Sequence, residues 1–129
     1  MQNPATPADV TKRWRSLNPQ ETVNAETFLA DAWRMVRRNV PDIATRLDAG
    51  TPAADDLRAD VVQVLAQAAL RVLKNLDGSK RESADDVSWE PDQAAASGLL
   101  EITPAEYVLL RPVATAYAAP GVYVVGLGG

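Results

Sequence analysis

Four helix-start signals recur along this sequence, and they restrict its fold more than any other feature. Each consists of a Thr or Asn, a Pro directly after it and an acidic residue two or three positions after the Pro: Thr6-Pro7-Ala8-Asp9, Asn18-Pro19-Gln20-Glu21, Thr51-Pro52-Ala53-Ala54-Asp55 and Thr103-Pro104-Ala105-Glu106. The Thr or Asn oxygen accepts a hydrogen bond from a free backbone N–H, Pro gives up no needed donor, and the acid lies near the positive end of the helix dipole. Each signal therefore predicts the first turn of a helix.

Apolar residues spaced three and four apart follow these signals, as is typical of amphipathic helices. Spacing and punctuation together predict five helical segments: Pro7 to about Trp14, Pro19 to about Arg38, Asp42 to Ala49, Pro52 to about Leu76 with Asp77-Gly78 ending the helix, and Pro104 to about Leu110. The segment from Pro52 has the longest apolar stripe, so we expect it at the centre. Aromatic residues make up only 5% of the chain, and a core of Ala, Leu and Val suits close helix packing. The predicted fold class is all-α, a small helical bundle around one long central helix.

Residues 79–98 are polar and lack the helical period. Two short runs in this segment, Lys80-Arg81-Glu82-Ser83 and Val87-Ser88-Trp89-Glu90, flank Ala84-Asp85-Asp86 and predict a short β-hairpin or loop inserted between helices. Val87 and Trp89 share one face of that hairpin. Because the chain is poor in aromatics, we expect Trp89 to anchor a partner protein there.

Residues 112–129 carry no charge, and they include a short strand-forming run between two glycines that cannot make a sheet by itself. An uncharged apolar segment of this kind is a liability in a free monomer. We therefore expect an extended C-terminal tail that adds as a strand to another chain, with these partner-binding residues: Val122, Tyr123, Val124, Val125 and Leu127. The alternative is a tail folded back on its own bundle. Residues 1–111, with 79–98 included, then form the helical domain.

The composition excludes many classes of enzyme mechanism. The chain has no Cys and no His, so it lacks thiol nucleophiles, thiolate and histidine metal ligands and the usual general base near neutral pH. Asp55, Asp56 and Asp60 lie in the opening turns of a predicted helix, where acids are favoured electrostatically. We expect no catalytic, cofactor-binding or metal-binding residues. The chain also has no apolar stretch of membrane-spanning length and no signal-peptide pattern at its N-terminus, which predicts a protein made inside the cell and no membrane partner.

Two basic clusters, Lys12-Arg13-Arg15 and Arg34-Arg37-Arg38, stand out in a chain with a formal net charge of −4. Either can contact DNA phosphates, but cations in the last turn of a helix also complement its dipole and pair with neighbouring acids. We assign Arg34, Arg37 and Arg38 to a subunit interface or a DNA channel. Trp33 lies beside the apolar stripe, where it fills either a core edge or a neighbouring subunit.

Several strings, in this order and spacing, carry a resemblance to a known family. They are Leu29-Ala30-Asp31-Ala32-Trp33-Arg34-Met35-Val36-Arg37 before Val40-Pro41-Asp42, then Val72-Leu73-Lys74-Asn75-Leu76-Asp77-Gly78, Lys80-Arg81-Glu82-Ser83, Val87-Ser88-Trp89, Gly98-Leu99-Leu100 and Ile102-Thr103-Pro104-Ala105-Glu106-Tyr107 with Leu110. Over roughly residues 8–112 the chain resembles the head-to-tail connector family of long-tailed bacteriophages, also called adaptor or head-completion proteins. The chain departs from that pattern at Ala84-Asp85-Asp86, where related sequences often have a glycine.

The resemblance implies a structural protein of the virion neck, made in the host cytoplasm and without catalytic residues. Such proteins assemble as a ring, typically of twelve copies, beneath the portal protein of the filled capsid. The ring extends the channel through which genomic DNA passes without sequence readout, and it presents a docking surface for the next neck (stopper or head-closure) or tail protein. The alternative function is a small helical DNA-binding protein for packaging or regulation, using the helices near residues 7–14 and 41–49.

Overall fold

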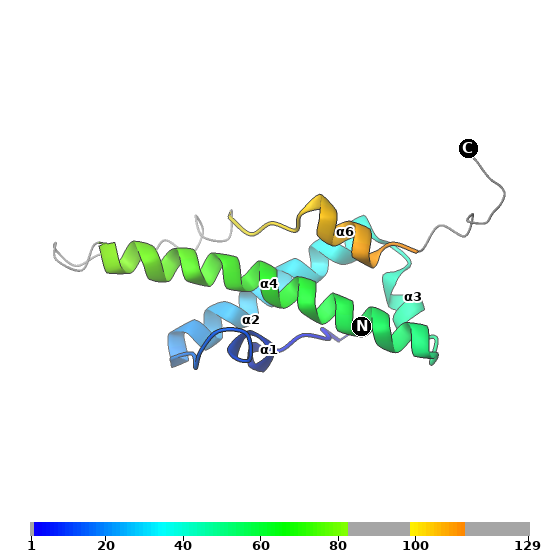
Figure 1. The fold of residues 1–129 in the computed structure, drawn as a ribbon, viewed down its shortest axis with the longest axis horizontal. Helices are drawn as coiled ribbons and strands as arrows, with labels where there is room; N and C mark the ends of the chain where they lie inside the picture. The colour runs from blue at the N-terminus through cyan, green and yellow to red at the C-terminus, as the bar shows by residue number, and fades with distance from the viewer. Residues whose placement is uncertain (1, 83–98, 113–129) are drawn as a thin grey trace.

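The computed structural model describes residues 2–82 and 99–112, which form an elongated helical body (Figure 1). These residues contain no strand. Their helices are α1 (Pro7–Thr11), α2 (Pro19–Asn39), α3 (Ile43–Leu47), α4 (Pro52–Glu82) and α6 (Pro104–Leu110). The all-α expectation is confirmed for this part of the chain, and the predicted starts at the four Pro residues agree with the structure.

The helix starts are capped by the residues that the sequence pattern singled out. The side chain of Asn18 accepts a hydrogen bond from the Glu21 N–H at 2.8 Å, and Glu21 accepts one from the Asn18 N–H at 3.0 Å. Thr103 and Glu106 exchange the same pair of bonds at 3.2 and 2.9 Å. Such reciprocal capping satisfies two backbone donors at once. Helices α2 and α6 therefore begin where local chemistry, independent of packing, favours a start.

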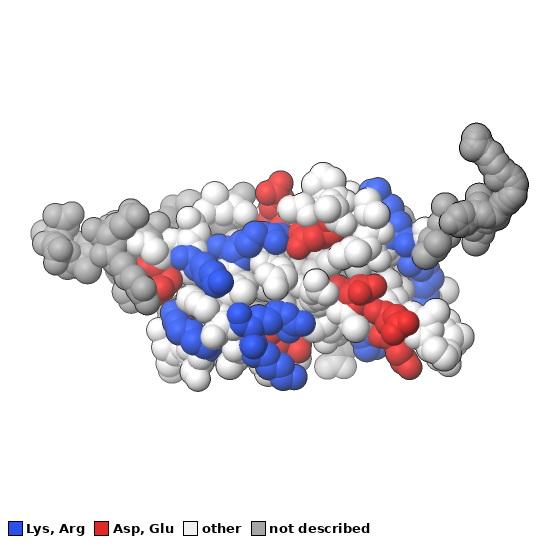
Figure 2. Space-filling model, viewed as in Figure 1, with Lys and Arg blue, Asp and Glu red and all other residues white. Residues whose placement is uncertain are grey.

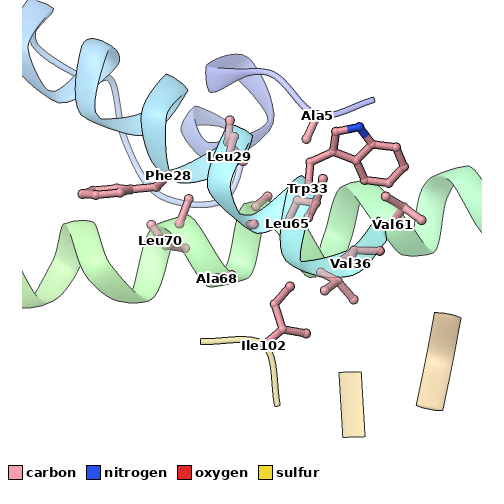
Figure 3. Close-up of a cluster of buried hydrophobic side chains, with 14 of the residues drawn as sticks. Ala5, Phe28, Leu29, Trp33, Val36, Val61, Leu65, Ala68, Leu70 and Ile102 are labelled. Carbon is pink, nitrogen blue, oxygen red and sulfur yellow. The ribbon is translucent and has the colours of Figure 1, made fainter. Parts of the chain in front are cut away.

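Helix α4 is the central element of the fold. It contacts each of the other described helices, α1, α2, α3 and α6. In Figure 1 it runs the length of the molecule, with α6 on one side and α1 on the other. Its middle part is buried almost all round, and Leu65 and Val61 have no exposed surface. Figure 3 shows these side chains meeting Leu29, Trp33 and Val36 of α2, so the core is the α2–α4 contact extended by its neighbours.

The predicted end of the central helix at Asp77-Gly78 is wrong, because α4 continues to Glu82. A glycine inside a helix costs only about 1 kcal/mol relative to alanine, and Lys80, Arg81 and Glu82 after it are good helix formers. Asp77 also forms an ion pair with Arg15 at 3.4 Å, which holds this turn against the α1–α2 corner. Residues 80–82 are consequently helical, not the first strand of a hairpin. The rest of the predicted hairpin, including Val87 and Trp89, lies outside the described residues.

Candidate functional site

Trp33 lies in the core of its own chain. Only 3% of the residue is exposed, and Figure 3 places its ring beside Ala5 and Val61. The guanidinium of Arg37 lies 5.5 Å from the ring centroid, within cation–π range. The indole Nε1 is buried and has no hydrogen-bond partner among the described residues. Of the two interpretations offered by the sequence, the structure therefore supports the core for this side chain.

The arginines that follow Trp33 lie on the outer surface of α2. Arg34, Arg37 and Arg38 are all exposed. Arg34 forms an ion pair with Asp31 one turn earlier, at 3.3 Å. Exposed pairs of this kind contribute little stability, so the Arg34 guanidinium can exchange its partner at small cost. Their assignment to a subunit interface or DNA channel remains a prediction, since the structure describes a single chain.

The other basic cluster is largely committed to internal contacts. Arg15 donates to both carboxylate oxygens of Glu21 at 2.9 Å and to Asp77 at 3.4 Å, and it lies 3.9 Å from the Trp14 ring centroid. The hydrogen bonds that Arg15 donates to Glu21 are the main reason that the pKa of Arg15 is raised. Arg13 donates to the backbone carbonyl of Asp9 at 2.9 Å. Arg15 thus has a structural role, and it ties α1, α2 and α4 together.

Apolar surface remains on α6 and the segment before it. Leu99, Val108 and Leu109 are each at least half exposed. Leu109 also lines an open groove of about 450 Å³ between α3, α4 and α6, whose other lining residues are Arg46, Ala49, Thr51, Ala53, Ala54, Asp56, Leu57, Asp60, Arg111 and Pro112. This groove opens where the chain passes from α6 into the predicted tail. Sequence reasoning missed it, because it depends on how three separate helices meet.

Charge on the molecular surface is segregated along α4. Figure 2 shows acidic side chains gathered over the N-terminal part of α4, and basic side chains over α1 and the C-terminal part of α4. Asp56 and Asp60 contribute to the acidic end, and both line the groove. Lys12, Arg13 and Lys74 are exposed at the basic end. Arg46 and Arg111 line the same groove as these two aspartates, so the separation of charges holds along α4 itself and not over the whole face.

The described residues contain no group of three or more acidic, His or Cys side chains placed to hold a metal ion. No helix in residues 2–82 or 99–112 is long and apolar enough to cross a membrane. The predicted partner-binding residues of the tail, from Val122 to Leu127, and Trp89 lie outside these ranges, so their roles remain predictions.

Comparison with known proteins gives two distant relatives, both from phages. Each is called Gene 19 protein, one from Mycobacterium phage D29 and the other from Mycobacterium phage L5. Both are 29% identical to this chain over 107 residues, which is 82% of this chain and 82% of each relative. No family model matches the sequence. Similarity over most of both chains points to a phage protein.

Proposed function

We propose that this protein is a structural head-to-tail adaptor of a phage. It forms a ring under the portal, extends the DNA channel and provides the docking surface for the next neck or tail protein. The observation that carries the proposal is the similarity, over 82% of the chain, to two phage proteins. The order of helices and the sequence strings that resemble the connector family add the specific role. The mechanism is geometric, and it requires neither a catalytic group nor a cofactor.

The helical body is suitable as a ring subunit because ion pairs join its helices into one unit. Arg15 joins the α1–α2 corner to α4 through Glu21 and Asp77. Arg71 of α4 joins α6 through Glu106 at 2.9 Å. A subunit whose helices are held together in this way is rigid enough to keep its shape within a ring. The exposed arginines of α2 and the apolar residues of α6 are then available for neighbouring copies or the channel.

In this proposal the parts beyond the helical body make the contacts with other virion proteins. The uncharged tail is assigned to the portal or the next neck protein, and Trp89 to a second contact with the same partners. The ring forms on the portal as a template, because a net charge of −4 on every chain opposes the gathering of many free chains into a ring. The copy number of twelve comes from the family resemblance.

Co-sedimentation with purified portal rings tests this function. The full-length protein is expected to co-sediment with portal rings and, by electron microscopy, to add a ring of density below them. A variant with Arg34, Arg37 and Arg38 changed to Glu serves as the interface control and is expected to bind portal without completing the ring. Absence of co-sedimentation under conditions in which the portal itself is intact would contradict the proposal.

The second candidate, a small DNA-binding protein, is favoured by the exposed Lys12, Arg13 and Lys74 at one end of the molecule. It is opposed by the acidic side chains at the other end and by the carboxylate partners of Arg15 and Arg34. Filter binding of duplex DNA across a salt series separates the two functions. A DNA-binding protein shows an affinity that falls steeply with salt, whereas the adaptor is expected to show none at physiological salt.

A further inference from the structure

One face of α4 carries a narrow stripe of polar residues that face the solvent. Its residues follow one another at spacings of four, three, four, four and three positions: Asp56, Asp60, Gln63, Gln67, Arg71 and Lys74. At about 100° of rotation per residue, this spacing keeps all six on one face of the helix. All six are exposed or half-buried. Of the other residues from Val61 to Leu73, all but the half-buried Val62 are buried.

Charge along this stripe changes sign about its midpoint. Two aspartates come first, two glutamines occupy the middle, and Arg71 and Lys74 end it. Figure 2 shows the same order on the surface, with acidic side chains over one end of α4, uncharged surface over the middle and basic side chains over the other end. Asp56 and Lys74 are eighteen positions apart, which is about five helical turns and about 27 Å. The side chains of Asp56 and Lys74 therefore lie on the same face of α4, near its opposite ends.

Most of the charged side chains in this stripe form no ion pair with other described residues of the chain. Asp56, Asp60 and Lys74 form no ion pair within the described part of the chain, whereas Arg71 is held by Glu106. A solvated polar stripe needs no such order of charges, since mixed signs along the helix would serve solubility equally well. Segregated signs, in contrast, create a surface that is complementary to itself when it is turned end to end.

We propose that the exposed stripe of α4 is a dimerisation surface, on which a second copy of this chain packs antiparallel about a two-fold axis near Leu65. In this register Asp56 of one copy lies opposite Lys74 of the other, Asp60 lies opposite Arg71, and Gln63 lies opposite Gln67. Each pair occurs twice, as a two-fold interface requires. The antiparallel order also sets the two α4 dipoles in opposition, which is favourable.

Parallel packing of the same stripe is disfavoured, because it sets aspartate against aspartate and cation against cation. A nucleic acid fits only the basic end and is repelled by the acidic end. A second copy, in contrast, satisfies both ends at once. This inference does not depend on the adaptor role, since a two-fold pair of free chains is a different assembly from a portal-bound ring.

Charge reversal at the two ends of the stripe tests the proposal by sedimentation of the full-length protein over a wide concentration range. The wild-type chain is expected to reach a dimer and go no further, with a dissociation constant that rises with salt. Asp56→Lys alone and Lys74→Glu alone each place like charges together twice, and each should weaken the dimer by about tenfold. The double variant Asp56→Lys/Lys74→Glu restores both pairs and should dimerise like the wild type. An equimolar mixture of the two single variants should give the heterodimer.

Asp55→Lys is the matched control, because it makes the same charge change in the same turn but about 100° away from the stripe. It should leave the dissociation constant unchanged, and circular dichroism should show the same helix content for every variant. A wild-type chain that stays monomeric, an Asp56→Lys variant that associates like the wild type, or a double variant without recovery each overturns the proposal. Association beyond the dimer overturns the two-fold arrangement.

Discussion

Arg71 of α4 donates to both carboxylate oxygens of Glu106, at 3.1 and 2.9 Å, while the same carboxylate caps the start of α6 through the Thr103 N–H at 2.9 Å. Arg15 and Glu21 repeat this arrangement at the start of α2. In both places the glutamate at the third helical position caps its own helix and also binds an arginine from another part of the chain. Local capping and tertiary packing are therefore joined at single carboxylates.

Glu106→Gln is expected to lower the free energy of unfolding at neutral pH by roughly 1 kcal/mol, because the bidentate ion pair is lost. The loss is no larger because solvent around the partly exposed Arg71 weakens the ion pair. Burial by itself raises the pKa of Glu106, but hydrogen bonds from Arg71 and from Thr103 outweigh it and bring the pKa below its usual value. A lowered folded-state pKa gives stability that is present above the unfolded-state pKa and lost as pH falls through the folded-state pKa.

Urea unfolding of the wild type and of Glu106→Gln across the acidic pH range checks this prediction. The difference between the two proteins should shrink as pH falls below the usual range of a glutamate. A difference that stays constant down to the acid-unfolding limit would show that the carboxylate charge of Glu106 adds nothing.

Leu65→Asp should cost several kcal/mol, near the whole stability of a domain of this size, because Leu65 has no exposed surface in the centre of α4. Asn75→Asp is the control at an exposed position of the same helix, and it should change stability by less than about 0.5 kcal/mol. Thermal melting followed by circular dichroism decides between them. A soluble Leu65→Asp protein with an unchanged melting temperature would contradict the central position of α4.

Trp33→Phe should change stability by less than about 1 kcal/mol, whereas Trp33→Ala should cost about 3–5 kcal/mol. The phenyl ring keeps most of the buried volume and removes the Nε1–H, which has no partner among the described residues. A buried donor without a partner costs about 1–3 kcal/mol, so its removal offsets the lost ring volume. Chemical denaturation of both variants measures this, and equal losses would mean that Nε1 has a partner.

Two glycines should respond to alanine in opposite directions. Gly50 has a positive φ of 69°, so Gly50→Ala is strained and should cost about 1 kcal/mol although the space around it is open. Gly78 lies within α4 with nothing inside 4 Å of an added Cβ, so Gly78→Ala should stabilise the protein by about 0.5–1 kcal/mol. Melting temperatures of both variants provide the readout. A destabilising Gly78→Ala would mean that α4 is not helical there.

Deletion of residues 119–129 should leave the melting temperature of the isolated protein nearly unchanged and weaken its attachment to portal rings. The reason is that the tail is assigned to partner contacts and not to the core of residues 2–112. Co-sedimentation with portal and thermal melting are measured on the same truncated protein. A lower melting temperature of the truncated protein, or normal binding to portal, would contradict the strand-addition role of the tail.

The helix starts could be predicted from sequence because a capping residue, a Pro and an acid act over a few neighbouring positions. The end of α4 could not, since Asp77-Gly78 is a local stop signal that an ion pair with Arg15, more than sixty positions away, helps to override. Trp33 was ambiguous for a related reason. Its burial depends on Ala5, which no helical period connects to α2. The charge order along α4, in contrast, can be read from the sequence, because its spacing is helical.

The shared carboxylate of Glu106 also bears on how the protein folds. Helix α6 has seven residues, which is too short to be stable alone in water. Because Oε1 of Glu106 accepts from both the Thr103 N–H and Arg71, the helix gains its start and its attachment together. Backbone amides of α6 should then exchange hydrogen with solvent in the same opening event that breaks the Arg71–Glu106 pair. We expect no population in which α6 is formed but detached.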